Sequence, residues 1–536
     1  MQTSCLTAAA LAALVPGPAW ATVYHVDAGA PAVVRDGLTW ETAFVRLEDA
    51  LSVAFFLDEI RVAGGTYTPD PTGLVDPRSA TFLLPADVHV IGGFAGHAAA
   101  DPNLRDLVAY ETILSGDLNG DDRQGGDNSD NCRNVVTATE LTGTETVFEG
   151  FTITGGNATA VFVPPFFPFG YPGGGMFVVG SRTLIDCTFR DNCAKAGGGL
   201  FSFEGSMALT RCVFEHNRAT EGGALGLFGT DDPSPPFGGT DDRGTIAHGT
   251  PTLIDCLFRD NHAVERAGAV WVDGIAENPT FRNCRWLGNR VDADGAALWS
   301  GGGFCELVNC LFSGNTAGQR GGAVYSDTLT TFRNCSIVGN RAHRGGGLFN
   351  PFIRSTLINT ILWDNTSETA TGESAQAAGD FLPPITSFSC VAGWTGAWGG
   401  QGNFGADPLF VPGPAGCYYL GQTAAGHATD SPCKDAGSES AINLGLADAT
   451  TRSDEVTDSG IADLGFHYPV TGNPLIPADS NHDGAIDLRD VAAFQACFGG
   501  TTTQPVPPCC RIFDAQPDGF VDLVDHSWMV EALGTP

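Results

Sequence analysis

The chain has 536 residues, enough for more than one domain, and carries 61 acidic against 27 basic residues, a formal net charge of −34. This balance lacks the basic footprint of a nucleic-acid-binding protein, and it suits a soluble exported protein or one that gathers cations. Glycine is abundant, at 71 residues, which favours many tight turns.

Residues 1–21 have the features of a secretory signal peptide. A short apolar stretch precedes the small-residue site Ala19-Trp20-Ala21, although the positively charged start typical of such signals is missing. No later apolar run in the sequence is long enough to cross a bilayer. We therefore expect a secreted protein, extracellular or at a cell surface, without a membrane span.

A short amphipathic helix is predicted within residues 40–54. Apolar residues recur there at helical spacing and would share one face: Trp40, Phe44, Leu47, Leu51 and Ala54. The strand-like segment EIRVAGGTYTP follows at once, over residues 59–69. A helix in this place would cover the open end of a stack of strands and protect its exposed edge.

The centre of the chain repeats the unit Cys-x-(aromatic or Ile)-x-x-Asn. Asn365 closes a further unit that has Thr360 in the cysteine place, and Asn157 in FTITGGN marks an earlier, degenerate one. From residue 192 to residue 365, the gaps between asparagines are 25, 44, 28, 26, 25 and 25 residues, the longest being one period plus an insertion. The units begin at Cys187, Cys212, Cys256, Cys284, Cys310 and Cys335 and end at Asn192, Asn217, Asn261, Asn289, Asn315 and Asn340.

A fixed period of this length indicates a solenoid, and the two-residue alternation within each unit indicates that it is built of strands. The cysteines and aromatics should stack inside, whereas the polar residues before each cysteine should face solvent. The asparagines should stack at a corner and hydrogen-bond along the axis. Disulfides or metal could use the cysteine column, but small buried thiols explain it more simply.

One constellation suggests chemistry. The units CTFRDN, CVFEHN and CLFRDN would place Asp191, His216 and Asp260 in one column, beside a second column of Arg190, Glu215 and Arg259. Carboxylates that flank a histidine could do acid–base work or hold a cation. The simpler interpretation is that opposite charges on neighbouring strands fix their register. The insertion before Cys256 weakens the expectation that these coils adjoin.

Three other segments are candidates for binding. The loop 161–174 contains aromatic side chains that could stack on sugars, dock a partner or cover a coil: Phe166, Phe167, Phe169 and Tyr171. The insertion 229–244 is acidic and rich in proline. Asp117, Asn119 and Asp121 have calcium-loop spacing, but no acidic residue closes that loop at the twelfth place. After the last unit, 407–469 should form closing turns, with a Cys417–Cys433 disulfide as an option.

The sharpest motif lies near the end of the sequence. DSNHDGAIDLRD (479–490) and DAQPDGFVDLVD (514–525) have the spacing of calcium-binding loops, and helix-like runs follow them. Gln516 and Pro517 should weaken the second loop. Cys497 and Cys510 could form a disulfide between the loops. The predicted ligands are Asp479, Asn481, Asp483, Ala485, Asp487 and Asp490, then Asp514, Gln516, Asp518, Phe520, Asp522 and Asp525, with Ala485 and Phe520 acting through their carbonyls.

The repeats and the paired loops carry two resemblances. Residues 22–470, clearest over 147–365, resemble the right-handed parallel β-helix (pectin-lyase-like) superfamily, and the F-x-x-N and GGA pairing is similar to polymorphic outer-membrane proteins. After a linker at 471–478, residues 479–536 resemble a type I dockerin. The resemblances imply a mainly β solenoid with a capping helix, then a small α-helical domain that binds calcium and a cohesin-like or other surface protein.

The β-helix fold alone leaves the activity open, because it carries lyases, hydrolases and adhesins alike. The motifs of polygalacturonases and of pectate lyases are absent from the sequence. We therefore predict a non-catalytic binding, adhesion or matrix protein that is docked through its tail, with polysaccharide as a possible ligand. The alternatives are a polysaccharide lyase or glycoside hydrolase that acts on acidic polysaccharide, and a self-associating structural protein.

Overall fold

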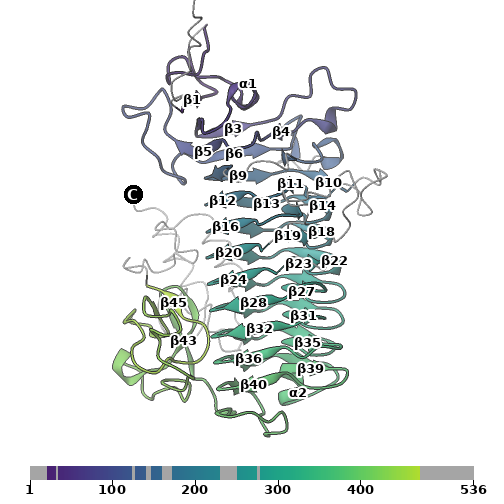
Figure 1. Cartoon of the computed structure of the whole chain (residues 1–536), viewed down its shortest axis with the longest axis vertical. Helices are drawn as coiled ribbons and strands as arrows, with labels where there is room; N and C mark the ends of the chain where they lie inside the picture. Colours follow the sequence, from purple (N-terminus) through teal and green to yellow (C-terminus); the bar gives the residue numbers. More distant parts are fainter. Residues whose placement is uncertain are drawn as a thin grey trace, which may run out of the picture.

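The computed structural model describes residues 21–31, 34–122, 127–139, 146–159, 172–229, 250–274 and 278–470. Within them, the chain winds into a solenoid whose coils stack along one long axis (Figure 1). A typical coil contributes one short strand to each of four parallel sheets, in the order A, B, D and C. The predicted mainly β solenoid is confirmed.

Sheets A and B follow each other in every regular coil. Sheet A contains β1 (Val23–Val26), β2 (Glu59–Ala63), β5 (His89–Phe94), β8 (Val147–Glu149), β12 (Thr183–Ile185), β16 (Ala208–Thr210), β20 (Thr252–Ile254), β24 (Thr280–Arg282), β28 (Cys305–Val308), β32 (Thr330–Arg333), β36 (Thr356–Ile358) and β40 (Ile385–Ser387). Sheet B contains β3 (Gly65–Tyr67), β6 (Thr112–Ser115), β9 (Phe151–Thr154), β13 (Thr188–Arg190), β17 (Val213–Glu215), β21 (Leu257–Arg259), β25 (Arg285–Leu287), β29 (Leu311–Ser313), β33 (Ser336–Val338), β37 (Ile361–Trp363) and β41 (Cys390–Val391).

Sheets D and C complete each coil. Sheet D contains β10 (Asn157–Ala158), β14 (Cys193–Ala196), β18 (Arg218–Glu221), β22 (His262–Arg266), β26 (Arg290–Val291), β30 (Thr316–Ala317), β34 (Arg341–Ala342) and β38 (Thr366–Ser367). Sheet C contains β4 (Phe82–Leu83), β7 (Val136–Ala138), β11 (Met176–Val179), β15 (Leu200–Phe203), β19 (Leu225–Phe228), β23 (Val270–Asp273), β27 (Leu298–Ser300), β31 (Val324–Ser326), β35 (Leu348–Asn350) and β39 (Ala377–Gly379).

Left-handed residues make the two corners that flank sheet B. The corner before each strand of this sheet is a residue with φ between 52° and 56°: Asp186, Arg211, Asp255, Asn283, Asn309, Asn334 and Asn359. The corner after the strand has φ between 53° and 66°: Asp191, His216, Asp260, Gly288, Gly314, Gly339 and Asp364. Short polar residues and glycine tolerate this conformation better than apolar ones, which explains why they recur here.

The predicted asparagine ladder is confirmed. Each ladder asparagine is buried, and its side-chain amide donates to the amide oxygen of the next, over 2.8–3.1 Å. Asn217 and Asn261 bond directly although the insertion separates them in sequence. The last asparagine of the ladder, Asn365, donates its side-chain N–H to Gln376 Oε1. At the N-terminal end of the ladder, the residue in register with Asn192 is Gly156, whose backbone N–H donates to Asn192 Oδ1. The prediction that Asn157 belongs to the ladder is therefore wrong by one residue.

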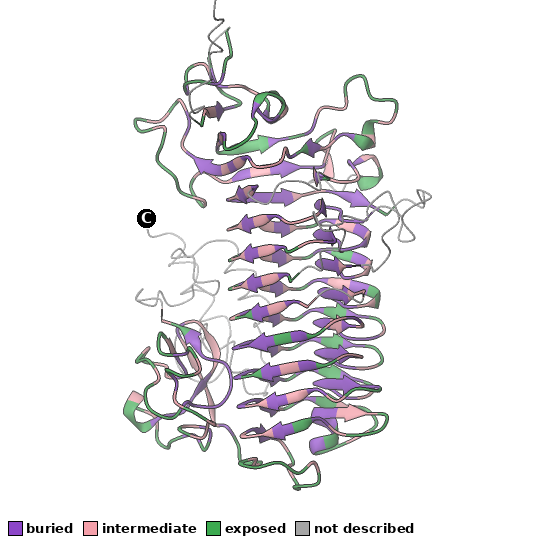
Figure 2. Cartoon of the chain, in the orientation of Figure 1, coloured by how far each residue is buried: buried purple, intermediate pink, exposed green. Residues whose placement is uncertain are grey.

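The interior is filled by stacked identical or similar side chains. Figure 2 shows that buried residues recur in the strands of each coil along the solenoid. Aromatic rings stack 4.5–5.3 Å apart from coil to coil: Phe189, Phe214, Phe258, Trp286 and Phe312. The six repeat cysteines are buried free thiols, as predicted. Burial raises the pKa of the Cys187, Cys212, Cys256 and Cys310 thiols, which keeps these four thiols protonated and unreactive.

The N-terminal cap is a shorter helix than the apolar spacing predicts. Helix α1 spans Leu47–Val53 and packs Leu47, Ala50 and Leu51 onto the end of the core. Phe44 is not helical, because its backbone exchanges hydrogen bonds with β1 through His25 and Asp27. Strand pairing with β1 therefore overrides the helical spacing before Arg46. The end-capping role that was predicted for the helix is confirmed (Figure 1).

The other end is covered by the segment 392–406, in which Trp394 and Trp398 pack against the core. Helix α2 (Glu373–Gln376) lies in the last complete coil. Residues 407–470, the docked unit, do not close this end as predicted but lie against the side of the solenoid (Figure 1). The docked unit contains two antiparallel pairs, β42 (Phe410–Gly413) with β43 (Gly416–Leu420) and β44 (Ala449–Thr450) with β45 (Tyr468–Pro469).

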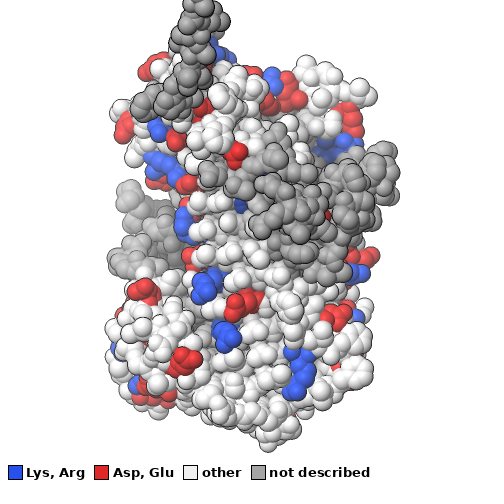
Figure 3. All heavy atoms as spheres, in the orientation of Figure 1, with Lys and Arg blue, Asp and Glu red and all other residues white. Residues whose placement is uncertain are grey.

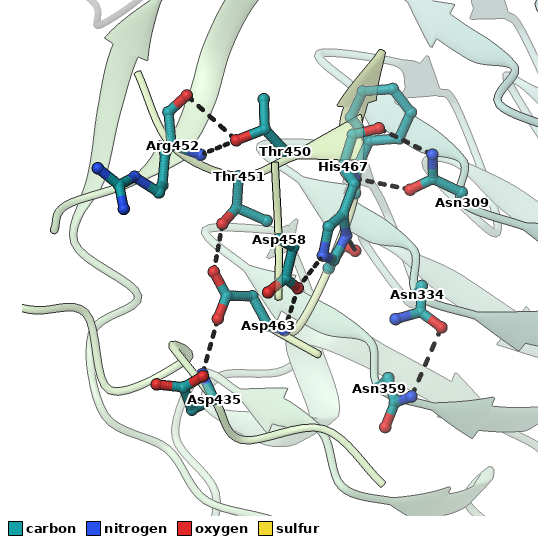
Figure 4. Close-up of polar contacts among 12 residues, drawn as sticks. Asn309, Asn334, Asn359, Asp435, Thr450, Thr451, Arg452, Asp458, Asp463 and His467 are labelled. Atoms are coloured by element: carbon teal, nitrogen blue, oxygen red, sulfur yellow. Dashed lines mark hydrogen bonds and ion pairs between the residues drawn. The ribbon is translucent and has the colours of Figure 1, made fainter. Parts of the chain in front are cut away.

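Buried polar contacts attach the docked unit to the corner of the solenoid, as Figure 4 shows. The backbone of His467 donates to Asn309 Oδ1 over 2.6 Å and accepts from Asn309 Nδ2 over 2.8 Å. The His467 imidazole lies 2.9 Å from the Asp458 carboxylate. Asn309, Asn334 and Asn359 are thereby at most 2% exposed, so the prediction that these corner residues face solvent is wrong for the last coils.

The cysteines of the docked unit remain reduced at Cys433. A Cys417–Cys433 disulfide is not formed, because Cys433 carries a free thiol that packs with Cys390. Within the described residues, no helix has the length and apolarity that a membrane span requires.

Candidate functional site

The structure brings the predicted column together. Register pairing places Arg190, Glu215 and Arg259 on neighbouring strands β13, β17 and β21, so the corner residues that follow them also adjoin. The corner residues are Asp191, His216 and Asp260, and His216 Nε2 lies 4.0 Å from Asp260 Oδ2. Both of these side chains are 56% exposed. Partial burial raises the pKa of Asp260, and His216 acts in the opposite direction.

The corner itself explains much of the column. Asp191, His216 and Asp260 occupy the left-handed position that glycine fills in later coils, for example at Gly288 and Gly314. The neighbouring column is partly an ion-pair ladder, because Arg259 Nε donates to Glu215 over 2.7 Å. Arg190 turns away toward Glu111, 3.4 Å from its carboxylate. Asp191, His216 and Asp260 are therefore neighbours in space. The left-handed corner conformation and ion pairing between neighbouring strands explain their residue types without a catalytic role.

A groove crosses strands β9 and β13 of sheet B beside this column. One hollow, of about 240 Å³, has Thr152 and Thr188 in its floor. The adjoining hollow, of about 360 Å³, has Thr154 and Arg190 in its floor, two positions further along the same strands. The remaining lining is Leu107, Val108, Glu111, Gly150, Phe151, Asp186 and Arg211 for the first hollow, and Thr66, Ile113, Ser115, Asp117, Asp122, Gly155 and Asp191 for the second. We call both hollows together the sheet B groove.

Among the described residues, two segments cover sheet B on either side of this stretch and leave the groove between them. The docked unit packs on the outer face of strands β25 to β37, where Leu287 and Leu311 contact Tyr419 and Phe466. Toward the N-terminus, residues 104–111 and 117–122 form the walls. Among the described residues, strands β9 and β13 lie between these two covers. Thr154, Thr188 and Arg190 are half-buried there, whereas Thr152 is buried under Glu111.

Charged side chains dominate the centre of the groove. Thr152 Oγ1 donates to Glu111 over 2.7 Å, and Arg190 approaches the same carboxylate. At one end, Arg211 makes a bidentate pair with Asp186 over 2.6 and 2.7 Å. The sequence prediction included Asp191 and Arg190 but missed Glu111 and Arg211. Glu111 belongs to a segment without a repeat, and Arg211 was predicted only as a solvent-facing polar residue before Cys212.

Apart from Asp117, Asn119 and Asp121, the remaining predicted sites lie outside the described residues. They are the twelve predicted calcium ligands of 479–525, the aromatic loop 161–171, most of the insertion 229–244 and the signal segment 1–20. Calcium and a cohesin-like partner therefore stay predictions for the tail. Figure 3 shows basic and acidic side chains interspersed on one face of the described residues, with no continuous basic patch there.

One comparison with known proteins, that with family models, supports the fold. The family model described as "Right handed beta helix region" matches residues 140–350. A solved rhamnogalacturonan lyase aligns at 12% identity over 63% of this chain and 82% of that chain, with a TM-score of 0.38. The Escherichia coli protein YbhC aligns at 13% identity over 60% of this chain and 76% of that chain, with a TM-score of 0.27.

A third solved structure, XylC in complex with xylose, aligns at 11% identity over 74% of this chain and 88% of that chain, with a TM-score of 0.28. Such distant likenesses say nothing about activity. No curated protein matches the chain. The stacked parallel sheets and the matched family model together show that the chain contains a right-handed parallel β-helix.

Proposed function

We propose that the protein is an exported, non-catalytic binding protein that holds an extended polysaccharide in the sheet B groove. The observation that carries this proposal is the stretch of sheet B, between the docked unit and the N-terminal walls, that the described residues leave open as a groove. Its floor presents the half-buried hydroxyls of Thr154 and Thr188, and Glu111, Arg190 and Asp191 lie around them. Hydroxyls, carboxylates and a guanidinium in a shallow groove can pair with the hydroxyls of a sugar chain.

Binding is favoured over catalysis by the surroundings of the histidine. A general acid or base needs hydrogen-bond reach to its partner, and catalytic groups are commonly shielded so that their pKa values are tuned. His216 is more than half exposed, lies 4.0 Å from Asp260 and occupies a corner that later coils fill with glycine. These features support a structural role for the column.

The second candidate function is a polysaccharide lyase or glycoside hydrolase. It is favoured by one observation: Arg190 shares a hollow with three carboxylates, those of Asp117, Asp122 and Asp191. Such a set could position an acidic sugar and move a proton. This candidate predicts new chain ends in the bound polymer, which the binding proposal does not.

The tail completes the proposal. Residues 479–536 would bind two calcium ions through the paired loops and dock the protein onto a cohesin-like or other surface protein. The support is the tandem spacing of aspartates in the sequence, with Gly484 and Gly519 at the sharp turn of each loop. The solenoid would then present its groove at a fixed place on a surface or matrix.

A bulky side chain in the groove should abolish binding. Thr188→Trp would fill the first hollow from its floor, whereas Thr183→Trp adds the same bulk to the outer face of sheet A in the same coil. We expect Thr188→Trp to weaken polysaccharide binding at least about tenfold, a loss of about 1.4 kcal/mol, and Thr183→Trp to leave it unchanged. Affinity electrophoresis through a panel of neutral and acidic polysaccharides measures this. Equal retention of both variants would refute the groove as the binding site.

A further inference from the structure

The loop that follows β6 gathers carboxylates at one wall of the groove. One oxygen of each of Asp117, Asp121 and Asp122 lies within 4.8 Å of the others. The Asp117 carboxylate accepts the backbone N–H groups of Gly120, Asp121 and Asp122 over 2.7–3.3 Å. The loop backbone is therefore wrapped around one carboxylate, which holds the next two close to it.

A buried amide oxygen beside these carboxylates has no partner. Asn131 is 1% exposed, and its Nδ2 donates to Asp122 Oδ2 over 2.7 Å and to the carbonyl of Gly155 over 2.8 Å. These two bonds fix the amide against the carboxylates and leave Asn131 Oδ1 without a hydrogen bond. A buried acceptor without a donor costs free energy, which a bound cation would recover.

Within the part of the chain that the structure describes, these carboxylates also have few hydrogen bonds and no ion pair with a basic side chain. The Oδ1 atoms of Asp121, Asp122 and Asp130 are buried and unpaired. Asp117, Asp121 and Asp122 each bring one oxygen within 4.8 Å of the others, a separation at which like charges repel. Repulsion among the carboxylates is thus built into the loop.

Two described arginines near the loop are engaged elsewhere. Arg190 lines the same hollow but lies against Glu111. Arg78 directs its guanidinium to the backbone carbonyls of Asn131 and Asn157. Within the described residues, no ion pair joins a basic side chain to Asp117, Asp121 or Asp122.

We infer that this loop is a calcium site in the solenoid itself, with Asp117, Asp121 and Asp122 as carboxylate ligands and Asn131 Oδ1 as a neutral ligand. The donors are all hard oxygens on a short loop, which suits calcium better than magnesium with its strict octahedral demand. The site is independent of the predicted tail loops and of the proposed polysaccharide binding. It would fix the wall of the sheet B groove.

Counting bound ions tests the site in the full chain. Equilibrium dialysis against calcium, followed by elemental analysis, should show that Asp121→Asn/Asp122→Asn binds one ion per chain fewer than the wild type. Asp127→Asn is the matched control, because Asp127 is an exposed aspartate of the same loop that caps Ser129. It should bind as many ions as the wild type. An equal count in the double variant, or uptake of magnesium but not calcium, would overturn the inference.

A measurement on the wild type avoids any folding defect of the variant. Hydrogen exchange of the backbone amides of 117–122 should slow about a hundredfold when free calcium is a hundred times the dissociation constant. Amides of the distant strand β32 should be unaffected, because they lie in the core far along the solenoid. No calcium effect on the loop amides would contradict the site.

Discussion

Replacing Asn315 by alanine should lower the free energy of unfolding by roughly 3–5 kcal/mol, because several buried polar groups would lose their hydrogen-bond partners at once. Asn315 Oδ1 accepts from both the backbone and the side chain of Asn289, over 2.9 and 3.0 Å. Its Nδ2 donates to the carbonyl of Trp286 over 3.0 Å and to Asn340 over 2.8 Å. Alanine offers no replacement for any of these bonds, and water cannot reach them.

The measurement is urea unfolding of the full chain, followed by tryptophan fluorescence. Asn443→Ala serves as the control, because Asn443 is an exposed turn residue of the docked unit. Its change should stay within about 0.5 kcal/mol. If Asn315→Ala were as mild as the control, the asparagine ladder would not be the structural element that the buried bonds indicate.

Removing calcium should unfold the tail. A segment of about sixty residues buries little apolar surface and needs a staple, and crowded carboxylates repel one another until a divalent ion neutralises them. Binding free energy then becomes folding free energy, on the order of 2.7 kcal/mol when free calcium is a hundred times the dissociation constant. The fragment 474–536 should therefore gain helical circular dichroism and thermal stability with calcium and lose both with a chelator.

The two loops of the tail should differ. Asp483→Ala should reduce calcium uptake and helix content more than Asp518→Ala, since Gln516 and Pro517 already weaken the second loop. Calorimetry on the fragment and its two variants separates the loops. A spectrum indifferent to chelator, or no calcium uptake by the wild-type fragment, would refute the dockerin-like assignment.

The regular part of the fold could be predicted because each coil repeats the same physical solution. The regular spacing of the asparagines from Asn192 to Asn365 predicts the ladder at the corner. The two-residue alternation around Cys187 and Phe189 predicts which side chains lie in the interior. The left-handed corners were not predicted as such, yet they left a trace in the sequence. Asp, Asn, His and Gly recur before the ladder asparagines and before the cysteines because few other residues tolerate positive φ.

The parts that escaped prediction depend on contacts between segments without periodicity. The repeat does not indicate that His467, far away in sequence, packs on Asn309. The prediction therefore placed Asn309 on the solvent-exposed surface. The spacing of Phe44 fits a helical face, but its backbone forms a β-bridge with β1 instead. The groove depends on Glu111 and on how far the docked unit reaches along sheet B, neither of which local spacing encodes.

The measurement that tests the central claim most directly follows binding and cleavage of one polysaccharide in the same sample. The wild-type protein is incubated with the polymer that it retains in affinity electrophoresis, and reducing ends and unsaturated products are counted over time, with and without calcium. Our account predicts that the polymer stays bound through the sheet B groove and that no new chain ends appear. Steady formation of new ends that is lost in a folded His216→Ala variant would contradict it and make the column of Asp191, His216 and Asp260 a catalytic site.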